Sequence, residues 1–215
     1  MCIWDVSNFL LPLSTTARFL FRRICLYSEI PLGWDSPIVD EMEAQVVSTL
    51  RNMLSAHGVV YPRLFFPAKG YKTNENSPLC CVTVDGSSEG LSAVIFGRFE
   101  YLDGDPRKTN GNFYHVSLMK SSSRLSPLSG LSTPKSEISS AVLGVKLRDQ
   151  LLKELDGSIV FSKTVFLSDS QCSLNQIGSR SCLFEPFFLT RLREIQAKTS
   201  YDQWYKLAGT LNPSD

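Results

Sequence analysis

The chain has 215 residues, of which 43% are hydrophobic and 20% charged, a composition that excludes a disordered or fibrous protein. Lys and Arg number 22 against 21 Asp and Glu, so the formal net charge of +1 excludes a strongly basic, histone-like binder but allows a local basic face. No apolar run reaches the roughly 18 residues that span a bilayer. The apolar run at residues 9–13 is too short for a signal peptide, so we expect an intracellular protein with no membrane partner.

The cysteines do not form a recognisable framework. The chain has six of them and two histidines, and no two cysteines have the two-residue gap that is typical of structural zinc sites. A disulfide scaffold is also not expected in a chain of this size. We predict free thiols, as is usual in a reducing compartment.

Residues 1–68 are predicted to form a small helical region. Ser14, Thr15 or Thr16 can cap a helix that runs to Leu26. A second helix is expected to start close to Pro37 and to end at Gly58. Both have apolar residues at helical spacing, and such short helices need an apolar partner. The polar segment 69–78 is predicted to be a linker.

From residue 79 the pattern is that of β-strands. Apolar and β-branched runs predict strands at 79–84, 92–99 and 114–119. Asp-Gly and Asn-Gly pairs within residues 102–112 are strong turn signals between the second and third of these strands. The sequence therefore predicts an antiparallel three-stranded meander.

The remaining chain alternates helices and strands. After a Ser-rich segment at 121–132, which is expected to be a loop, the pattern predicts helices at 134–151 and 184–196 and strands at 160–167 and 204–207. A meander followed by helix, strand, helix and strand is a mixed α/β layout.

Four acidic residues are candidates for chemistry. Asp85 and Asp169 each end an apolar strand, Glu137 is placed in the first turn of a helix, and Asp215 lies in the tail. Taken singly, turns, caps and the helix macrodipole account for such acids. Together, acids at the ends of neighbouring strands and at the start of a helix can converge. Carboxylates and water are the usual ligands of Mg²⁺, and a pair of such ions can promote phosphodiester cleavage.

Several short strings carry more information as an ordered set than any of them does alone. In chain order they are LGWD (32–35), VDGS (84–87), TPKSE (133–137), LSDSQ (167–171) and NPSD (212–215). The set resembles the reverse transcriptase–ribonuclease H region of Bel/Pao-type retrotransposon polyproteins. The resemblance is collinear and covers nearly the whole chain.

The sequence departs from this family pattern at a few positions. The family usually has a basic residue at Ser122, Leu at Ser136, His at Lys206, Pro at Ala208 and Ala at Ser214. Without the histidine there is less local help for proton transfer or product release, whereas all four acids are present. The family continues into more chain and an integrase. The resemblance therefore implies an excised or truncated piece, in which a terminal Asp215 can fray.

The resemblance implies an α/β fold: a ribonuclease H-like mixed five-stranded sheet flanked by helices at 79–215, preceded by a helical connection region from the end of the reverse transcriptase at 1–68. It implies an endonuclease that hydrolyses the RNA strand of RNA–DNA hybrids and leaves 5′ phosphate and 3′ hydroxyl ends. The implied ligands of two Mg²⁺ ions, with Mn²⁺ as a substitute, are Asp85, Glu137, Asp169 and Asp215. The implied partners are the hybrid and the polymerase and integrase portions of the polyprotein, in a cytoplasmic virus-like particle or the nucleus.

Two questions stay open from the sequence. Ser87, Ser170, Gln171 and Asn175 are candidate hybrid contacts, which would read ribose hydroxyls and helix shape, but a role as a turn or cap residue explains each of them at least as well. The alternative to an enzyme is a catalytically weakened or domesticated fragment that acts as a hybrid-binding or scaffold module. Cleavage of a labelled hybrid with Mg²⁺ and with EDTA would separate these two functions.

Overall fold

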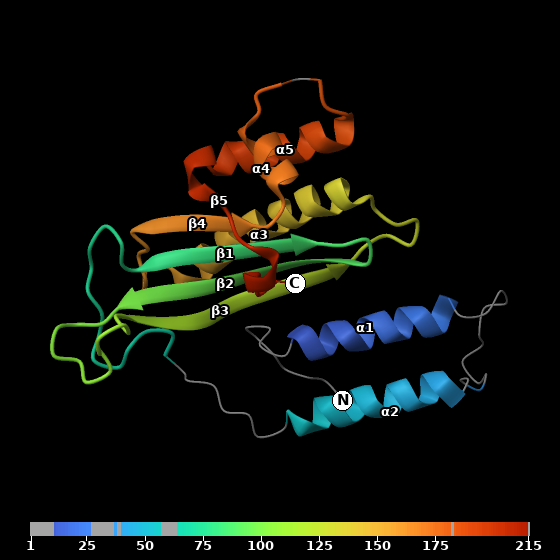
Figure 1. Cartoon of the computed structure of the whole chain (residues 1–215), viewed down its shortest axis with the longest axis horizontal. Coiled ribbons are helices and arrows are strands. Elements are labelled where there is room, and N and C mark those ends of the chain that lie inside the picture. The colour runs from blue at the N-terminus through green and yellow to red at the C-terminus, as the bar shows by residue number, and fades with distance from the viewer. Residues whose placement is uncertain (1–10, 27–36, 38–39, 57–63, 182, 215) are drawn as a thin grey trace. The chain divides into compact units, whose positions relative to one another are not determined.

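The fold is described from a computed structural model for residues 11–26, 37, 40–56, 64–181 and 183–214 (Figure 1). The chain divides into two compact units, Met1–Pro62 and Arg63–Asp215. Within the described ranges, no helix is both long enough and apolar enough to cross a membrane.

Two amphipathic helices form the described part of the first unit. They are α1 (Leu11–Leu26) and α2 (Asp40–Ser55), and they contact each other. α1 begins before the predicted caps, because Pro12 suits the first turn of a helix. The Pro12 carbonyl also accepts a hydrogen bond of 2.9 Å from the Thr16 hydroxyl. Apolar side chains line a groove between the two helices, formed mainly by Ala17, Leu20, Phe21, Ile24, Val46, Leu50 and Met53.

The second unit is built on a mixed five-stranded sheet with the strand order β3-β2-β1-β4-β5. Strands β1 (Leu79–Gly86), β2 (Gly90–Glu100) and β3 (Tyr114–Leu125) form the predicted antiparallel meander. Strand β4 (Lys163–Ser168) is parallel to β1, and β5 (Trp204–Lys206) is parallel to β4. Together with the flanking helices, this sheet confirms the predicted fold class.

Three helices make the crossover connections that parallel strands require. The long helix α3 (Thr133–Leu155) leads from β3 to β4, and α4 (Gln171–Gly178) and α5 (Pro186–Lys198) lead from β4 to β5. α3 packs on β1 and β2, and α5 packs on α3. In Figure 1, α3 lies behind the sheet, and the C-terminal segment crosses in front of β1 and β2.

The main core lies between the sheet and α3. Val82 and Val84 of β1 are fully buried against this helix. Gly144 allows the close approach, because a Cβ at this position would lie 3.2 Å from a Val82 methyl group and would collide with Val84. On the neighbouring strands, Trp204 stacks on Phe166 with ring centroids 4.5 Å apart. Side chains alternate along a strand, so Thr83, which lies between these two valines, faces away from α3.

One prediction about the elements was wrong, and one helix was not predicted. Residues 121–125, expected to be the start of a loop, form the end of β3, where they pair with β2 from Gly90 to Val94. The ladder hydrogen bonds are made by the backbone, so this Ser-rich run can extend the strand despite its low β propensity. Helix α4 was not predicted at all, although Leu174 and Ile177 are buried at helical spacing.

The segment before β1 belongs to the second unit and packs on its core. Phe65, Phe66 and Tyr71 contact its core, with the rings of Tyr71 and Phe99 centred 5.0 Å apart. The Lys72 amide donates to the Glu100 carbonyl at 2.9 Å. Residues 69–78, expected to be a linker, therefore include side chains and backbone groups that belong to this unit.

Candidate metal-binding active site

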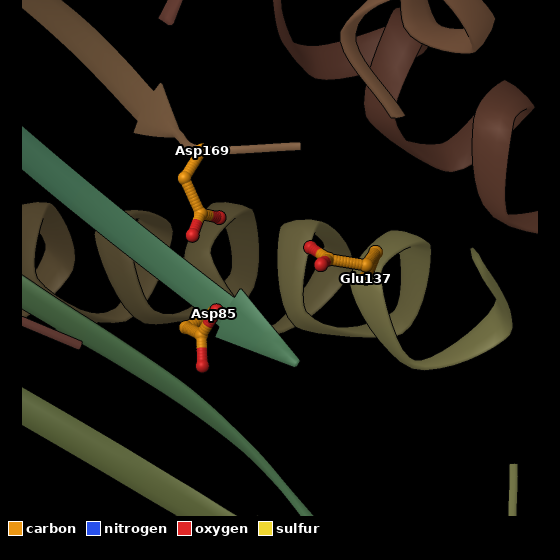
Figure 2. Close-up of side chains that lie close together, drawn as sticks. All are labelled: Asp85, Glu137 and Asp169. Atoms are coloured by element: carbon orange, nitrogen blue, oxygen red, sulfur yellow. The ribbon is translucent and has the colours of Figure 1, made fainter. Parts of the chain in front are cut away.

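The topology brings three of the predicted acids together. Asp85 is the penultimate residue of β1, and Asp169 directly follows β4. Thr83 pairs with Leu167 in the parallel ladder between these strands, so two further residues along each strand place Asp85 and Asp169 at the same level. The carboxylate oxygens of Asp85, Glu137 and Asp169 lie within 4.8 Å of one another, and Figure 2 shows the three side chains around one space.

Glu137 reaches this space because the start of α3 touches the end of β1. A Cβ on Gly86 would lie 2.5 Å from the Ser136 carbonyl carbon and 2.8 Å from the Glu137 nitrogen. Only glycine therefore fits between the strand and the helix. α3 starts at Thr133, so Glu137 lies in the second turn of the helix, not in the first turn as the sequence suggested. The macrodipole effect is concentrated in the first turn and gives a weaker explanation for this acid.

The environment of Glu137 disfavours its negative charge. All three side chains are half-buried. Burial, followed by the charges of Asp169 and Asp85, raises the pKa of Glu137 to about 7. One oxygen of Glu137 (Oε2) and one of Asp169 (Oδ1) are buried without a hydrogen-bond partner among the described residues. Buried, unpaired carboxylate oxygens are costly unless another group compensates them.

A divalent cation fits this donor set. Hard oxygen donors suit Mg²⁺ and Mn²⁺. A cation would also compensate the two unpartnered oxygens and the mutual repulsion of the carboxylates. Asp215, the fourth predicted ligand, lies outside the described residues.

The segment that leads to Asp215 is anchored beside the other acids. The Leu207 amide donates to the Ser168 carbonyl at 2.9 Å, next to Asp169. A Cβ on Gly209 would lie 3.2 Å from Asp169 Oδ2. Ser214 is buried, and its hydroxyl shares a hydrogen bond of 2.6 Å with that of Thr83. The chain is therefore fixed to the sheet as far as Ser214.

The four predicted substrate contacts fall into two groups. The Ser87 hydroxyl accepts from the amides of Glu89 and Gly90 in the β1–β2 turn. Ser170 caps α4 by accepting from the Ser173 amide at 3.3 Å. The hydroxyl oxygens of both serines thus serve local structure. The other group, Gln171 and Asn175, consists of exposed side chains joined by a 3.0 Å hydrogen bond on α4, which begins two residues after Asp169.

Two further residues belong to the surroundings of the site. Lys206, at the position where the family usually has histidine, pairs in the β4–β5 ladder with Ser168, the residue before Asp169. Asn212 is buried and bonded to β1. The NPSD string contained this asparagine, but only Asp215 was given a role.

Four of the six cysteines are described, and all four are free thiols, as predicted.

One family model matches most of the chain. Residues 1–170 match the family model described as the Pao retrotransposon-like RNaseH-like domain, a range that includes Asp85, Glu137 and Asp169. No curated protein matches the chain.

Solved structures similar to the chain include the N-terminal RNase H domain of Rv2228c from Mycobacterium tuberculosis, with 16% identity and a TM-score of 0.42 over 63% of this chain and 86% of that one. LC11-RNase H1, solved in complex with an RNA/DNA hybrid, has 12% identity and a TM-score of 0.42 over 62% and 88%. The foamy viral protease-reverse transcriptase, solved in complex with double-stranded DNA, has 11% identity and a TM-score of 0.36 over 93% of this chain and 31% of that one.

Proposed function

Because the chain belongs to the Pao retrotransposon-like RNaseH-like domain family, we propose that it hydrolyses the RNA strand of RNA–DNA hybrids with the help of Mg²⁺ or Mn²⁺. The observation that carries the proposal is the convergence of Asp85, Glu137 and Asp169, whose oxygens lie within 4.8 Å of one another. A protein that serves only as a scaffold gains nothing from three acids that destabilise one another.

Each acid has a distinct part in the proposed site. Asp85 and Asp169 extend from two adjacent strand ends and would supply ligand oxygens from a rigid sheet. Glu137, with its raised pKa, would release its proton as a cation binds, because a nearby positive charge favours the ionised carboxyl. Asp215 would complete the set. When bound, divalent cations of this kind lower the pKa of an attacking water and neutralise charge on a leaving oxygen.

The exposed carboxamides of Gln171 and Asn175 are the proposed hybrid contacts. Amide groups donate and accept hydrogen bonds, so they can pair with the ribose 2′-hydroxyl that distinguishes RNA from DNA. α4 presents both side chains from one face, because residues four apart are neighbours on a helix. Ser87 and Ser170 have supporting parts in the local fold under this proposal.

The proposed setting is that of the family. The polymerase and integrase portions of a parent polyprotein would be the protein partners, in a virus-like particle or the nucleus. Phe21, Leu50 and Leu54 of the first unit, which are 61%, 53% and 58% exposed, give it an apolar surface suited to such a partner.

The test is a cleavage assay with a 5′-labelled RNA annealed to DNA. We expect Mg²⁺-dependent cleavage that stops with EDTA, and no cleavage of the DNA strand or of double-stranded RNA. Asp202→Asn is a matched control for Asp169→Asn, because Asp202 is exposed on a short helical turn. Hybrid binding without cleavage at any Mg²⁺ concentration would favour the non-enzymatic alternative.

A further inference from the structure

Asn212 links the two chain segments that carry the first and the last of the four acids. Its Nδ2 donates to the carbonyl of Val84, the residue before Asp85, at 3.2 Å. Its Oδ1 accepts from the amide of Ser214, the residue before Asp215, at 3.2 Å. A single buried carboxamide thus bonds to the neighbour of Asp85 and to the neighbour of Asp215.

The other contacts of the segment are of a different kind. The Ser92 hydroxyl donates to the Ser214 carbonyl, and the hydroxyls of Thr83 and Ser214 are bonded to each other. These contacts fix residue 214 to the outer face of β1 and β2. The carboxamide of Asn212 instead bonds to the backbone of β1, at the carbonyl of the residue immediately before Asp85.

The geometry points to Asn212 as a positioning residue that holds the end of β1, and with it the carboxylate of Asp85, in place for a divalent cation. This inference rests on the proposed function. Asn212 acts through the backbone of the residue before Asp85, as outer residues of metal sites commonly act on the ligands. Its carboxamide donates from one atom and accepts at another, whereas alanine has no polar group and the single, shorter hydroxyl of serine does not reach both partners.

The test measures cation affinity directly on the full chain, without substrate. Mn²⁺ binding to the wild type, Asn212→Ala, Ser214→Ala and Asn112→Ala is followed by isothermal titration calorimetry and by the EPR signal of free Mn²⁺. Asn112 is a matched control, since it is an exposed asparagine whose amide donates to a backbone carbonyl in a loop, that of Arg107, at 3.3 Å. Melting temperatures in EDTA establish that each variant is folded.

We expect Asn212→Ala to bind Mn²⁺ about tenfold more weakly, the lower end of the loss usual for outer residues of metal sites. Asn112→Ala is expected to bind as the wild type does. Ser214→Ala keeps the backbone bonds to Asn212 and Ser92 and is expected to lose less than Asn212→Ala. In cleavage, Asn212→Ala should need more Mg²⁺ for half-maximal rate and approach the wild-type kcat at saturating Mg²⁺, which a purely structural defect would not produce.

Each other result overturns the inference in a distinguishable way. Unchanged Mn²⁺ affinity in a folded Asn212→Ala protein would give Asn212 a structural role only and leave the proposed function intact. Equal losses in Asn212→Ala and Ser214→Ala would assign the anchoring to the whole segment. A wild type that neither binds Mn²⁺ nor cleaves the hybrid would remove the proposed function and this inference together. If Asn212→Ala does not fold, Asn212→Ser, which keeps a polar group but cannot make both bonds, is judged by the same criteria.

Discussion

Glu137 and Asp169 hold their carboxylates within 4.8 Å of each other, although each has one buried oxygen without a partner in the described part of the chain. Glu137 extends from α3 and Asp169 from the end of β4 (Figure 2), and Gly86 at the end of β1 lets the start of α3 come close enough for the two to meet. Such an arrangement costs stability unless a cation or a proton compensates it.

The pH dependence of stability should reveal Glu137. Its pKa is about 7 in the folded protein, against 4.5 for an ordinary glutamate. Between these values the folded state holds more protons than the unfolded state, so the free energy of unfolding should fall as pH rises from about 4.5 to about 7 and level off above. Because solvent screens a half-buried group, the fall should be on the order of 1 kcal/mol. Urea unfolding in EDTA checks this. Glu137→Gln should remove this fall in the free energy of unfolding with pH. If the variant keeps the full fall, other titrating groups cause it.

Asp169→Asn should abolish cleavage and at the same time stabilise the protein without metal. The substitution removes a ligand, and it also removes a charge that repels Glu137. A gain of about 1 kcal/mol would raise the melting temperature in EDTA by roughly 2–4 °C. The exposed Asp202→Asn should change neither property. Activity retained in Asp169→Asn would contradict the assignment of this acid.

Much of the fold could be predicted because its signals are local. The strand cores of β1, β2 and β3 and the body of α3 have the expected apolar spacing, and Gly104 and Gly111 in the predicted turn region have φ values of +82° and +97°. The end of β3 could not be predicted, because its Ser-rich residues are held by β2 and not by their own propensity. Helix α4 has only eight residues, too few for a clear periodic signal.

The site could be predicted only in part. The resemblance to the Bel/Pao region, which the family match confirms, named Asp85, Glu137 and Asp169, and the structure brings the carboxylates of these three residues together. The bond from Asn212 to Val84 joins residues 128 positions apart, and no pattern in the sequence marks such a contact. Likewise, the structural duties of the Ser87 and Ser170 hydroxyls depend on the turn and the helix that form around them.

Gly86→Ala should weaken cation binding by moving Glu137 away from the two aspartates. The added Cβ would lie 2.5 Å from the backbone of Ser136, so the start of α3 must shift. Gly144→Ala is the control, because its Cβ would collide with Val84 in the middle of the same interface between helix and sheet. Overpacking should lower the free energy of unfolding of both variants by about 1–3 kcal/mol, so both should unfold at a lower temperature. Mn²⁺ titration should show a larger loss of affinity for Gly86→Ala, and equal losses would contradict this account of how Glu137 is placed.

Gln171→Ala and Asn175→Ala should raise KM for the hybrid without changing Mn²⁺ affinity. Both side chains are exposed and bonded to each other, so their removal should cost little stability. A lost hydrogen bond to substrate of about 1 kcal/mol corresponds to roughly a fivefold rise in KM. Gln150→Ala is a suitable control, because Gln150 also donates to a residue four positions along its helix, Glu154, at 2.9 Å. An unchanged KM in the double variant would remove both residues from the substrate-contact set.

The last prediction concerns where the chain can be divided. Phe65, Phe66 and Tyr71 pack on the core of the second unit, and the Ser117 hydroxyl donates to the Phe65 carbonyl at 2.5 Å. A fragment that starts at Leu64 keeps these contacts, whereas one that starts at Ser77 exposes Phe99, which is fully buried in the whole chain. Truncation of a single buried Phe typically costs 3–5 kcal/mol, so the shorter fragment should be less stable by at least about 3 kcal/mol. Urea unfolding of the two fragments compares their stability, and Mn²⁺ titration compares their metal sites. The longer fragment should bind Mn²⁺ as the whole chain does, because the three described acids all follow residue 79. If instead the longer fragment folds but no longer binds the cation, the first unit contributes to the site, and the assignment of the metal site to the second unit alone is wrong.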